Sequence, residues 1–480
     1  MTHLKITIGS SLIALAMQTA FAAPTVAQLE TIVNDYGHAD LFSGTVLIAK
    51  DSKILYAGTY GDASKDYRLA NTLESSYNIG SIGKTFTAVA IMQLVEAKKI
   101  SLADPLAKYF PDAPFPEKNT ITIAHLLNHS SGLGNYMGHK DYAARATTLR
   151  QISDVLPLIF DDKPEFAAGE RASYSNSGMV VLGAIIEKVS GMTYEAYLRA
   201  HVFQTAGMRR SGLVQEDQVL LNRAIGYSKT LDGGYRSNVA SVPPAFSDGG
   251  LRSTVGDMLK FDQALFGDKL LTPESRKKML TPSGPDREYG YGWESKGADA
   301  AHYVGHNGGA PGVNAEFRHY DSGYTLIVLS NYNHGATEVV NKIEAALLDR
   351  PYAAPTAADI NFGLAIDLQE QDDNVNALAV FDRNRMLKPQ HLLSLYSAAR
   401  MRISERKDAQ IAIDDLDLYL QNASAEAQPT QAAAWWRKGN AFELLKNNAE
   451  AIKCYEKSMA LDPMMPQPRM DLDRVKALKP

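Results

Sequence analysis

The chain has 480 residues, of which 45% are hydrophobic and 21% are charged, and its formal net charge at pH 7 is −5. This composition is typical of globular proteins, and the length allows more than one hydrophobic core. A weakly acidic chain with no surplus of basic residues argues against a nucleic-acid partner.

The N-terminus has the features of a secretory signal peptide over residues 1–22. His3 and Lys5 precede a largely apolar stretch, and the run Ala20-Phe21-Ala22 has the small-x-small form of a cleavage site. Cys454 is the only cysteine, so an internal disulfide cannot form, which is compatible with a bacterial periplasm. We therefore expect a periplasmic or secreted protein without a membrane span after cleavage. The alternative, an uncleaved anchor, lacks a stop-transfer pattern.

The first predicted element is a β-hairpin. Residues 44–49 and 53–57 are mostly apolar and flank the polar run Lys50-Asp51-Ser52, which favours a turn. A helix is predicted further on, over residues 84–98. Apolar residues occupy most of its sides, which is typical of a buried helix.

Ser81 and Lys84 form a Ser-x-x-Lys run at the start of this helix. The two side chains are about one helical turn apart on the same face. The positive end of the helix dipole favours negative charge that develops on the serine oxygen. Similar runs begin at Ser275 and Ser404, but both lie in polar, charged stretches. The context therefore indicates Ser81 as the candidate nucleophile.

Helices dominate the middle of the chain, and strands return before residue 350. Further helices are predicted near residues 121–128, 177–190, 193–203 and 335–348, and strands around residues 301–304, 313–318 and 324–329. Early strands, a helical middle and late strands predict an α+β fold. One sheet is built from both ends of this region, and a helical region is inserted between them.

A linker with two prolines is predicted at residues 351–357, and the remainder, residues 358–480, has an all-helical composition. Its last part resembles the tetratricopeptide repeat, with matching positions at Trp435, Gly439, Phe442, Ala451, Tyr455 and Pro463. Ala377, Phe381 and Pro389 repeat the last three at matching spacing, whereas residues 391–421 are degenerate. Stacked repeats form concave binding surfaces, so the tail is a possible site for a protein partner. The alternative is a generic helical bundle.

Two further runs supply polar groups that a serine nucleophile requires. In Tyr174-Ser175-Asn176, the phenol near a cation ionises more easily and can pass a proton to a leaving group, and the amide can orient Lys84 and hold a substrate carbonyl. In His306-Asn307-Gly308, followed by Gly309, glycine allows an acyl group to lie close to a strand, which we expect to be an edge strand. We expect the N–H groups of Ser81 and Gly309 to hold the oxyanion.

Together the runs Ser81-x-x-Lys84, Tyr174-x-Asn176 and His306-x-Gly308 resemble those of the penicillin-recognising serine hydrolases. The group with class C β-lactamases, D,D-peptidases, D-aminopeptidases and related esterases is the most similar. The resemblance covers residues 27–350 and is supported by residues 126–133, 174–178 and 249–254. It implies a β-lactamase/transpeptidase-like antiparallel sheet flanked by helices, with Ser81 acylated and Lys84 and Tyr174 as the acid/base pair. It also implies that Asn176, His306, Gly308 and Gly309 face the substrate, and that the enzyme uses no cofactor or metal.

One motif departs from this family's pattern. Class C β-lactamases have Lys-Thr-Gly where this chain has His306-Asn307-Gly308. An ammonium there is a fixed positive charge for a substrate carboxylate, whereas histidine is mostly neutral at pH 7. We therefore expect peptides or esters of D-amino acids as substrates, and weak or absent β-lactam hydrolysis.

Two alternatives to this interpretation remain. His125 and His129 have the spacing of two zinc ligands on a helix, but Leu126 replaces the glutamate of His-Glu-x-x-His and no further ligand follows nearby. Packing and loop orientation are the simpler roles for them. A buried structural role is the alternative for Tyr174. For the whole chain, the alternative to an enzyme is a catalytically weak adaptor that binds a partner through its helical tail.

Overall fold

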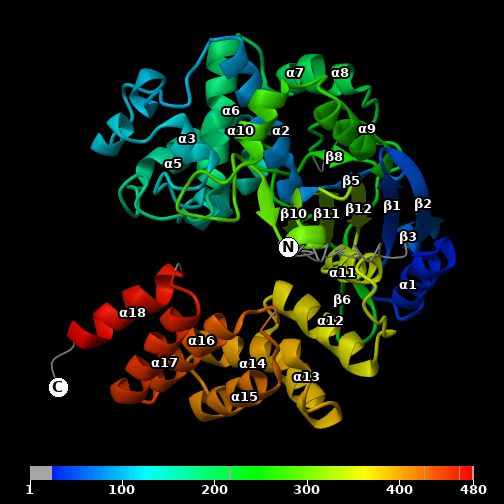
Figure 1. The fold of residues 1–480 in the computed structure, drawn as a ribbon, viewed down its shortest axis with the longest axis vertical. Helices are drawn as coiled ribbons and strands as arrows, with labels where there is room; N and C mark the ends of the chain where they lie inside the picture. Colours follow the sequence, from blue (N-terminus) through cyan, green and yellow to red (C-terminus); the bar gives the residue numbers. More distant parts are fainter. Residues whose placement is uncertain (1–23, 216–217, 426, 464, 478–480) are drawn as a thin grey trace, which may run out of the picture.

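The computed structural model describes residues 24–215, 218–425, 427–463 and 465–477 (Figure 1). The predicted signal peptide lies outside these residues. Within them, no helix has both the length and the apolar character that crossing a membrane requires.

A six-stranded antiparallel sheet forms the centre of the first 350 residues, with the order β2-β1-β12-β11-β10-β9. Its strands are β1 (Gly44–Lys50), β2 (Lys53–Tyr60), β9 (Glu294–Lys296), β10 (Tyr303–Ala310), β11 (Val313–Tyr320) and β12 (Tyr324–Ser330). β1 pairs with β12 along its whole length, from Gly44 opposite Ser330 to Lys50 opposite Tyr324. The prediction of one sheet built from both ends of this region is confirmed. The strand expected around residues 301–304 begins at Tyr303 and continues to Ala310.

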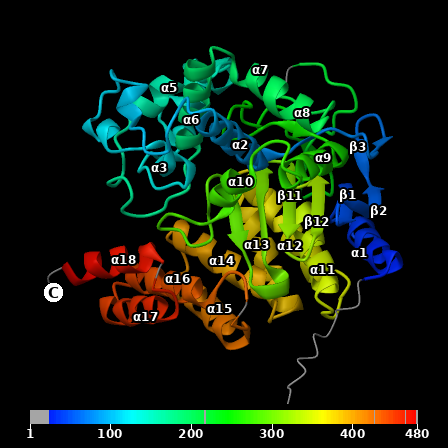
Figure 2. The same ribbon diagram turned by 45° about the horizontal axis from the view of Figure 1, so that its top comes forward.

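Helices cover both faces of the sheet (Figures 1 and 2). On one face α1 (Val26–His38) and α11 (Gly335–Leu347) pack on Val46 and Ile48 of β1. The alternate residues of the same strand, Leu47 and Ala49, face the larger core that contains α2 (Gly83–Glu96). This division follows from the two-residue period of a strand, which directs successive side chains to opposite faces.

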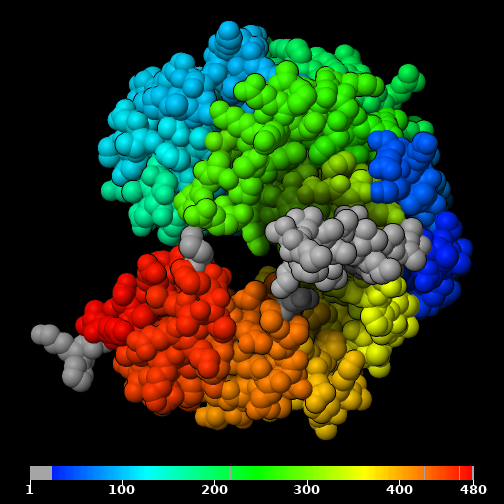
Figure 3. All heavy atoms as spheres, viewed as in Figure 1, coloured from blue at the N-terminus to red at the C-terminus, as the bar shows by residue number. Residues whose placement is uncertain are grey.

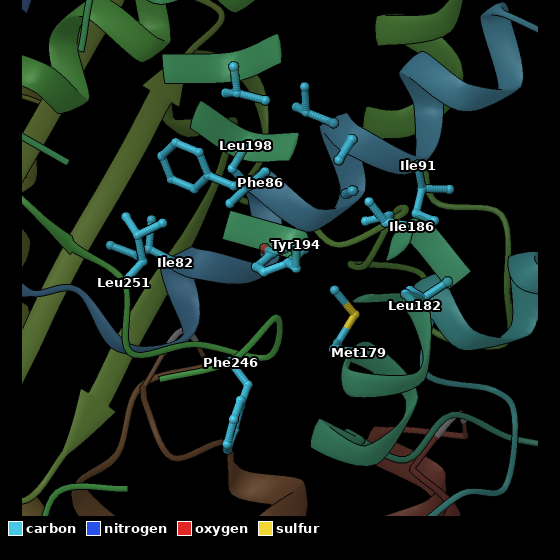
Figure 4. Close-up of a cluster of buried hydrophobic side chains, with 14 of the residues drawn as sticks. Ile82, Phe86, Ile91, Met179, Leu182, Ile186, Tyr194, Leu198, Phe246 and Leu251 are labelled. Carbon is cyan, nitrogen blue, oxygen red and sulfur yellow. The ribbon is translucent and has the colours of Figure 1, made fainter. Parts of the chain in front are cut away.

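The inserted helical region surrounds α2, which is buried on nearly all sides as its apolar sequence predicts. The other helices of this region are α3 (Ile123–Leu127), α4 (Tyr142–Arg145), α5 (Ile152–Asp161), α6 (Asn176–Ser190), α7 (Tyr194–Leu198), α8 (Gln204–Ala206), α9 (Val255–Phe266) and α10 (Pro273–Leu280). Figure 4 shows Phe86 and Ile91 of α2 among side chains of the helical region, including Ile186 of α6 and Leu198 of α7. This packing fixes the start of α2 next to the sheet.

Short strands connect these layers in pairs: β3 (Asp62–Ser64) with β4 (Leu69–Ala70), β5 (Tyr77–Asn78) with β8 (Arg252–Ser253), and β6 (Tyr227–Lys229) with β7 (Tyr235–Ser237). β5 lies directly before Ser81 in the chain, and β8 follows the 248–250 loop. The pairing of the two strands continues in a hydrogen bond from the N–H of Ile79 to the carbonyl of Leu251, which brings this loop close to Ser81. The β6–β7 pair leads into the 238–244 loop.

The tail is a helical array that forms a second lobe (Figure 3). Its helices are α12 (Ala357–Glu370), α13 (Asn374–Leu387), α14 (Leu392–Ser404), α15 (Ala409–Asn422), α16 (Gln431–Leu444), α17 (Asn448–Leu461) and α18 (Pro466–Ala477). Residues 391–421, which match the repeat pattern poorly, nevertheless form the helix pair α14–α15. Gly439 of α16 illustrates the close packing, because a Cβ there would lie 2.4 Å from the Tyr455 ring.

Candidate active site

Ser81 lies in a short 3-10 turn, Gly80–Ile82, that leads directly into α2. This turn lies against β10. A Cβ on Gly80, whose φ is +52°, would be 2.7 Å from the N of Gly309, and a Cβ on Gly308 would be 2.0 Å from the carbonyl oxygen of Ile79. Glycine at both positions therefore allows the strand and the serine turn to touch.

The position of β10 corrects one expectation. The strand was expected at the edge of the sheet, but β9 occupies that edge. β9 pairs only with residues 303–305 of β10. The first half of β10 is thus covered by β9. The second half, residues 306–310, has the serine turn at its side in place of a neighbouring strand.

Lys84 connects the serine to two other segments. Its Nζ donates to Ser81 Oγ at 3.0 Å, to Asn176 Oδ1 at 2.8 Å and to the carbonyl oxygen of Asp248. The side chain is fully buried, and these three acceptors match the three donors of an ammonium group. The Lys84 amine is thus held between Ser81, Asn176 and the backbone at Asp248.

Tyr174 lies next to this amine. Lys84 Nζ is 4.8 Å from the centroid of the Tyr174 ring, within the range of a cation–π contact. Tyr174 is 49% exposed, so the alternative of a buried structural tyrosine is wrong. The residue precedes Ser175, whose Oγ accepts the N–H of Gly178 and caps α6. The start of one helix thus places Tyr174 and Asn176 beside the start of another.

A family model matches the part of the chain that contains all of these residues. The model for beta-lactamase matches residues 29–350, about two thirds of the chain. The chain belongs to the beta-lactamase family. A second model, for the tetratricopeptide repeat, matches residues 432–464, which span α16 and α17.

Relatives of this family have similar sequences and folds. Penicillin-binding protein 4* of Bacillus subtilis is 30% identical over 352 residues, which are 68% of this chain and 77% of that protein. Teichoic acid D-alanine hydrolase of Staphylococcus aureus is 27% identical over 270 residues, 55% of this chain and 65% of that protein. The crystal structure of a penicillin binding protein from Bacillus halodurans has 37% identity and a TM-score of 0.61, and covers 66% of this chain and 98% of that one. The protein is thus a serine hydrolase of the beta-lactamase family with a tetratricopeptide-like tail.

Two side chains that the sequence did not single out for catalysis, His129 and Tyr289, pack against Tyr174 and His306 of β10. The His129 ring lies 4.5 Å from that of Tyr174 and 4.7 Å from that of Tyr289, between centroids. Its Nδ1 accepts the N–H of Ser175, and burial holds its pKa well below the usual value, so the ring is neutral. His125 has a separate role at the start of α3, where its Nδ1 accepts the N–H of Thr122. His129 differs from such a structural histidine in its contacts with the rings of Tyr174 and Tyr289, which only the tertiary structure brings together.

His306 stands on β10, and its expected contact with the substrate stays a prediction. Its side chain is buried, its Nδ1 donates to the carbonyl of Asn307 at 2.6 Å, and its Nε2 accepts the hydroxyl of Tyr289 at 3.0 Å. Burial, aided by the charge of Lys84, lowers the pKa of His306 to about 4. The position that bears an ammonium in Lys-Thr-Gly enzymes is therefore uncharged here at pH 7.

This buried histidine predicts a specific loss of stability in acid. Between pH 6.5 and about 4 the unfolded chain binds a proton at His306 that the folded chain does not bind, so stability falls as the pH falls through this range. The contribution amounts to about 3 kcal/mol at the acid end. We expect His306→Gln to lose less stability between pH 7 and pH 4.5 than the wild type. Urea denaturation at both pH values measures the difference, and equal losses would contradict a neutral buried His306.

A cavity of about 260 Å³ opens beside Ser81. Its lining contains Asn78, Gly80, Ser81, Met137, Asn176, Val242, Pro243, Pro244, Asp248, Gly249, Gly250, Gly309, Ala310 and Pro311. No lysine, arginine or histidine is among these described residues. The one carboxyl group, of Asp248, is buried and accepts the hydroxyl of Tyr136 at 3.1 Å, and burial raises its pKa. Most of the remaining lining is apolar, and Gly309 but not His306 or Gly308 takes part in it.

Proposed function

We propose that this protein is an exported serine hydrolase that forms an acyl-enzyme at Ser81 and acts on peptides or esters of D-amino acids. The observation that carries the proposal is the contact of Lys84 Nζ with both Ser81 Oγ and Asn176 Oδ1, next to the ring of Tyr174. A serine hydroxyl becomes a useful nucleophile only when a neighbouring group takes its proton. Here two candidate groups lie beside it.

In the proposed reaction, Ser81 Oγ attacks the carbonyl carbon of the substrate while its proton passes to the Lys84–Tyr174 pair. The N–H groups of Ser81 and Gly309 donate to the oxyanion; both lie where the serine turn touches β10. The pair then returns the proton to the leaving amine or alcohol, and the acyl group remains on Ser81. A water molecule attacks this ester in the second half, and the same pair handles its proton in reverse.

The size and lining of the cavity favour substrates with small, uncharged acyl groups. A substrate carboxylate finds no cationic side chain among the described lining residues, and His306 is neutral at pH 7. Penicillins and cephalosporins carry such a carboxylate, so we expect their hydrolysis to be weak or absent. The name of the Staphylococcus aureus relative, teichoic acid D-alanine hydrolase, favours D-alanyl esters as the first substrates to test. Periplasmic or extracellular location and a protein partner for the tail remain predictions.

Labelling of Ser81 tests this function. We expect a fluorophosphonate probe to form an adduct with the wild type and none with Ser81→Ala. The matched control is Ser275→Ala, which removes the serine of another Ser-x-x-Lys run, on α10, and should leave labelling unchanged. A panel of D-alanyl peptides, short p-nitrophenyl esters and nitrocefin then identifies the substrate class. An adduct that persists in Ser81→Ala, or none in the wild type, would contradict the proposal.

A further inference from the structure

The first tail helix makes a polar contact with the hydrolase domain through Asp367. This carboxylate is 6% exposed and accepts the backbone N–H of Lys229 at 2.9 Å and the Nδ2 of Asn333 at 2.7 Å. Just after α12, Gln371 Nε2 donates to the carbonyl of Lys229 at 2.6 Å. The end of β6 is therefore bound by two tail side chains, and α12 lies beside β6 in Figure 1.

Asn333 extends this contact to the turn between β10 and β11. Its Oδ1 accepts the N–H of Gly312 at 2.6 Å, while its Nδ2 also donates to Ser228 Oγ at 2.9 Å. Gly312 has a φ of +64°, and a Cβ there would lie 2.6 Å from the N of Tyr227. The turn is thus packed directly on β6, the strand that Asp367 binds.

Asn238 fastens the next segment to the same turn. Its Nδ2 donates to the carbonyl of Pro311 at 2.7 Å, and its Oδ1 accepts the N–H of Gly226 at 3.1 Å. Asn238 stands at the start of the 238–244 loop, and this loop and the β10–β11 turn form one wall of the cavity at Ser81. The wall consists of Val242, Pro243, Pro244, Gly309, Ala310 and Pro311.

The contact between the tail and the hydrolase domain contains a buried carboxylate, that of Asp367, at a place where an apolar side chain would be enough to hold the two together. Burying a carboxylate is costly unless hydrogen-bond donors compensate, and an apolar residue would dock α12 at less cost. Two of the donors that compensate here are the N–H of Lys229 and the amide of Asn333, and the latter holds the turn. Lys229 Nζ forms its ion pair with Asp40, at 3.3 Å. The hydrogen-bond donors that compensate for burial of the Asp367 carboxylate are therefore the same groups that connect it to the cavity wall.

We infer that Asp367 is a positioning residue of the acyl-binding wall, so that the helical tail, through Asn333 and Gly312, helps to set which acyl groups reach Ser81. That the wall binds acyl groups rests on the proposed function. The connection from the tail to the wall does not depend on it. In this arrangement the tail is a structural part of the active site, whatever partner it binds.

The test compares full-length Asp367→Ala with the wild type and with Asp415→Ala. Asp415 is a matched control, because it is a buried tail carboxylate that bonds Arg402 and Arg385 within the helical array. Hydrogen–deuterium exchange of the 305–313 and 238–244 segments should become at least tenfold faster in Asp367→Ala and stay unchanged in Asp415→Ala. The ratio of kcat/KM for p-nitrophenyl butyrate and acetate should change at least fivefold in Asp367→Ala alone.

Exchange or substrate ratios that match those of the control would overturn the inference. If the wild type hydrolyses none of the esters, the proposed function fails, and exchange alone then decides whether Asp367 positions the wall. Should Asp367→Ala not fold, Asn333→Ala and Gln371→Ala carry the same test. Asn333→Ala should release the Gly312 amide most strongly, because it removes the acceptor of that N–H.

Discussion

We expect Lys84→Met to lower kcat/KM by on the order of 10⁴ or more, an effect similar to the loss of one member of a catalytic triad. Methionine is close to lysine in length but has no amine, so Ser81 Oγ loses the donor at 3.0 Å and Asn176 Oδ1 the one at 2.8 Å. The Lys84 side chain is fully buried, so water does not readily take the place of its amine. Steady-state hydrolysis of the best ester substrate measures the loss.

The control for this variant is Lys278→Met, which removes an exposed lysine from the Ser-x-x-Lys run on α10. It should retain wild-type activity. Activity of Lys84→Met within tenfold of the wild type would remove Lys84 from the proposed acid/base pair. In that case Tyr174 alone would have to accept the serine proton.

We expect Gly308→Ala to lower turnover by about 10²–10³, the effect of losing one oxyanion donor. The new methyl group would lie 2.0 Å from the carbonyl oxygen of Ile79 and 3.0 Å from the N of Ser81. Both are backbone atoms, so β10 must move away from the serine turn, and Gly309 moves with it. The same overlap should destabilise the fold by about 1–3 kcal/mol.

Gly309→Ala is a matched control one residue along the strand. A Cβ there meets only the carbonyl oxygen of Val313, at 3.9 Å, and the N–H that the mechanism uses is retained. Urea denaturation of this variant should stay near that of the wild type. Equal losses of stability in the two variants would show that the overlap at Gly308 does not move β10 away from the serine turn.

The proposed coupling gives the tail a role beside any binding function. Tetratricopeptide-like arrays are built from helix pairs that contact mainly their neighbours, so a local change can pass along them. The first pair is bonded to β6 through Asp367 and Gln371. A partner that shifts α12 would thereby reach the wall of the cavity without entering it.

Periodic segments with strong local signals were predictable from the sequence. The apolar run of β1, the nearly all-apolar α2 and the final helix pair follow from patterns that act over a few residues, and the structure confirms the sheet and the buried helix. Two of the polar runs, with Ser81 and Lys84 and with Tyr174 and Asn176, were also identifiable, and both lie at the starts of helices. The structure brings these four together.

What the sequence could not determine depends on contacts between distant segments. The side chain of His306 is buried against Tyr289 and is not part of the cavity lining, and β9 instead of β10 forms the edge of the sheet. Likewise, nothing local marks Asp367, whose significance comes from Lys229 and Asn333, 138 and 34 residues away. Local sequence was enough to predict the candidate catalytic groups and most helices and strands, because these depend on spacing along the chain. The tertiary structure alone decided which of those groups face the cavity, because packing and hydrogen bonds across the fold choose each side chain's direction.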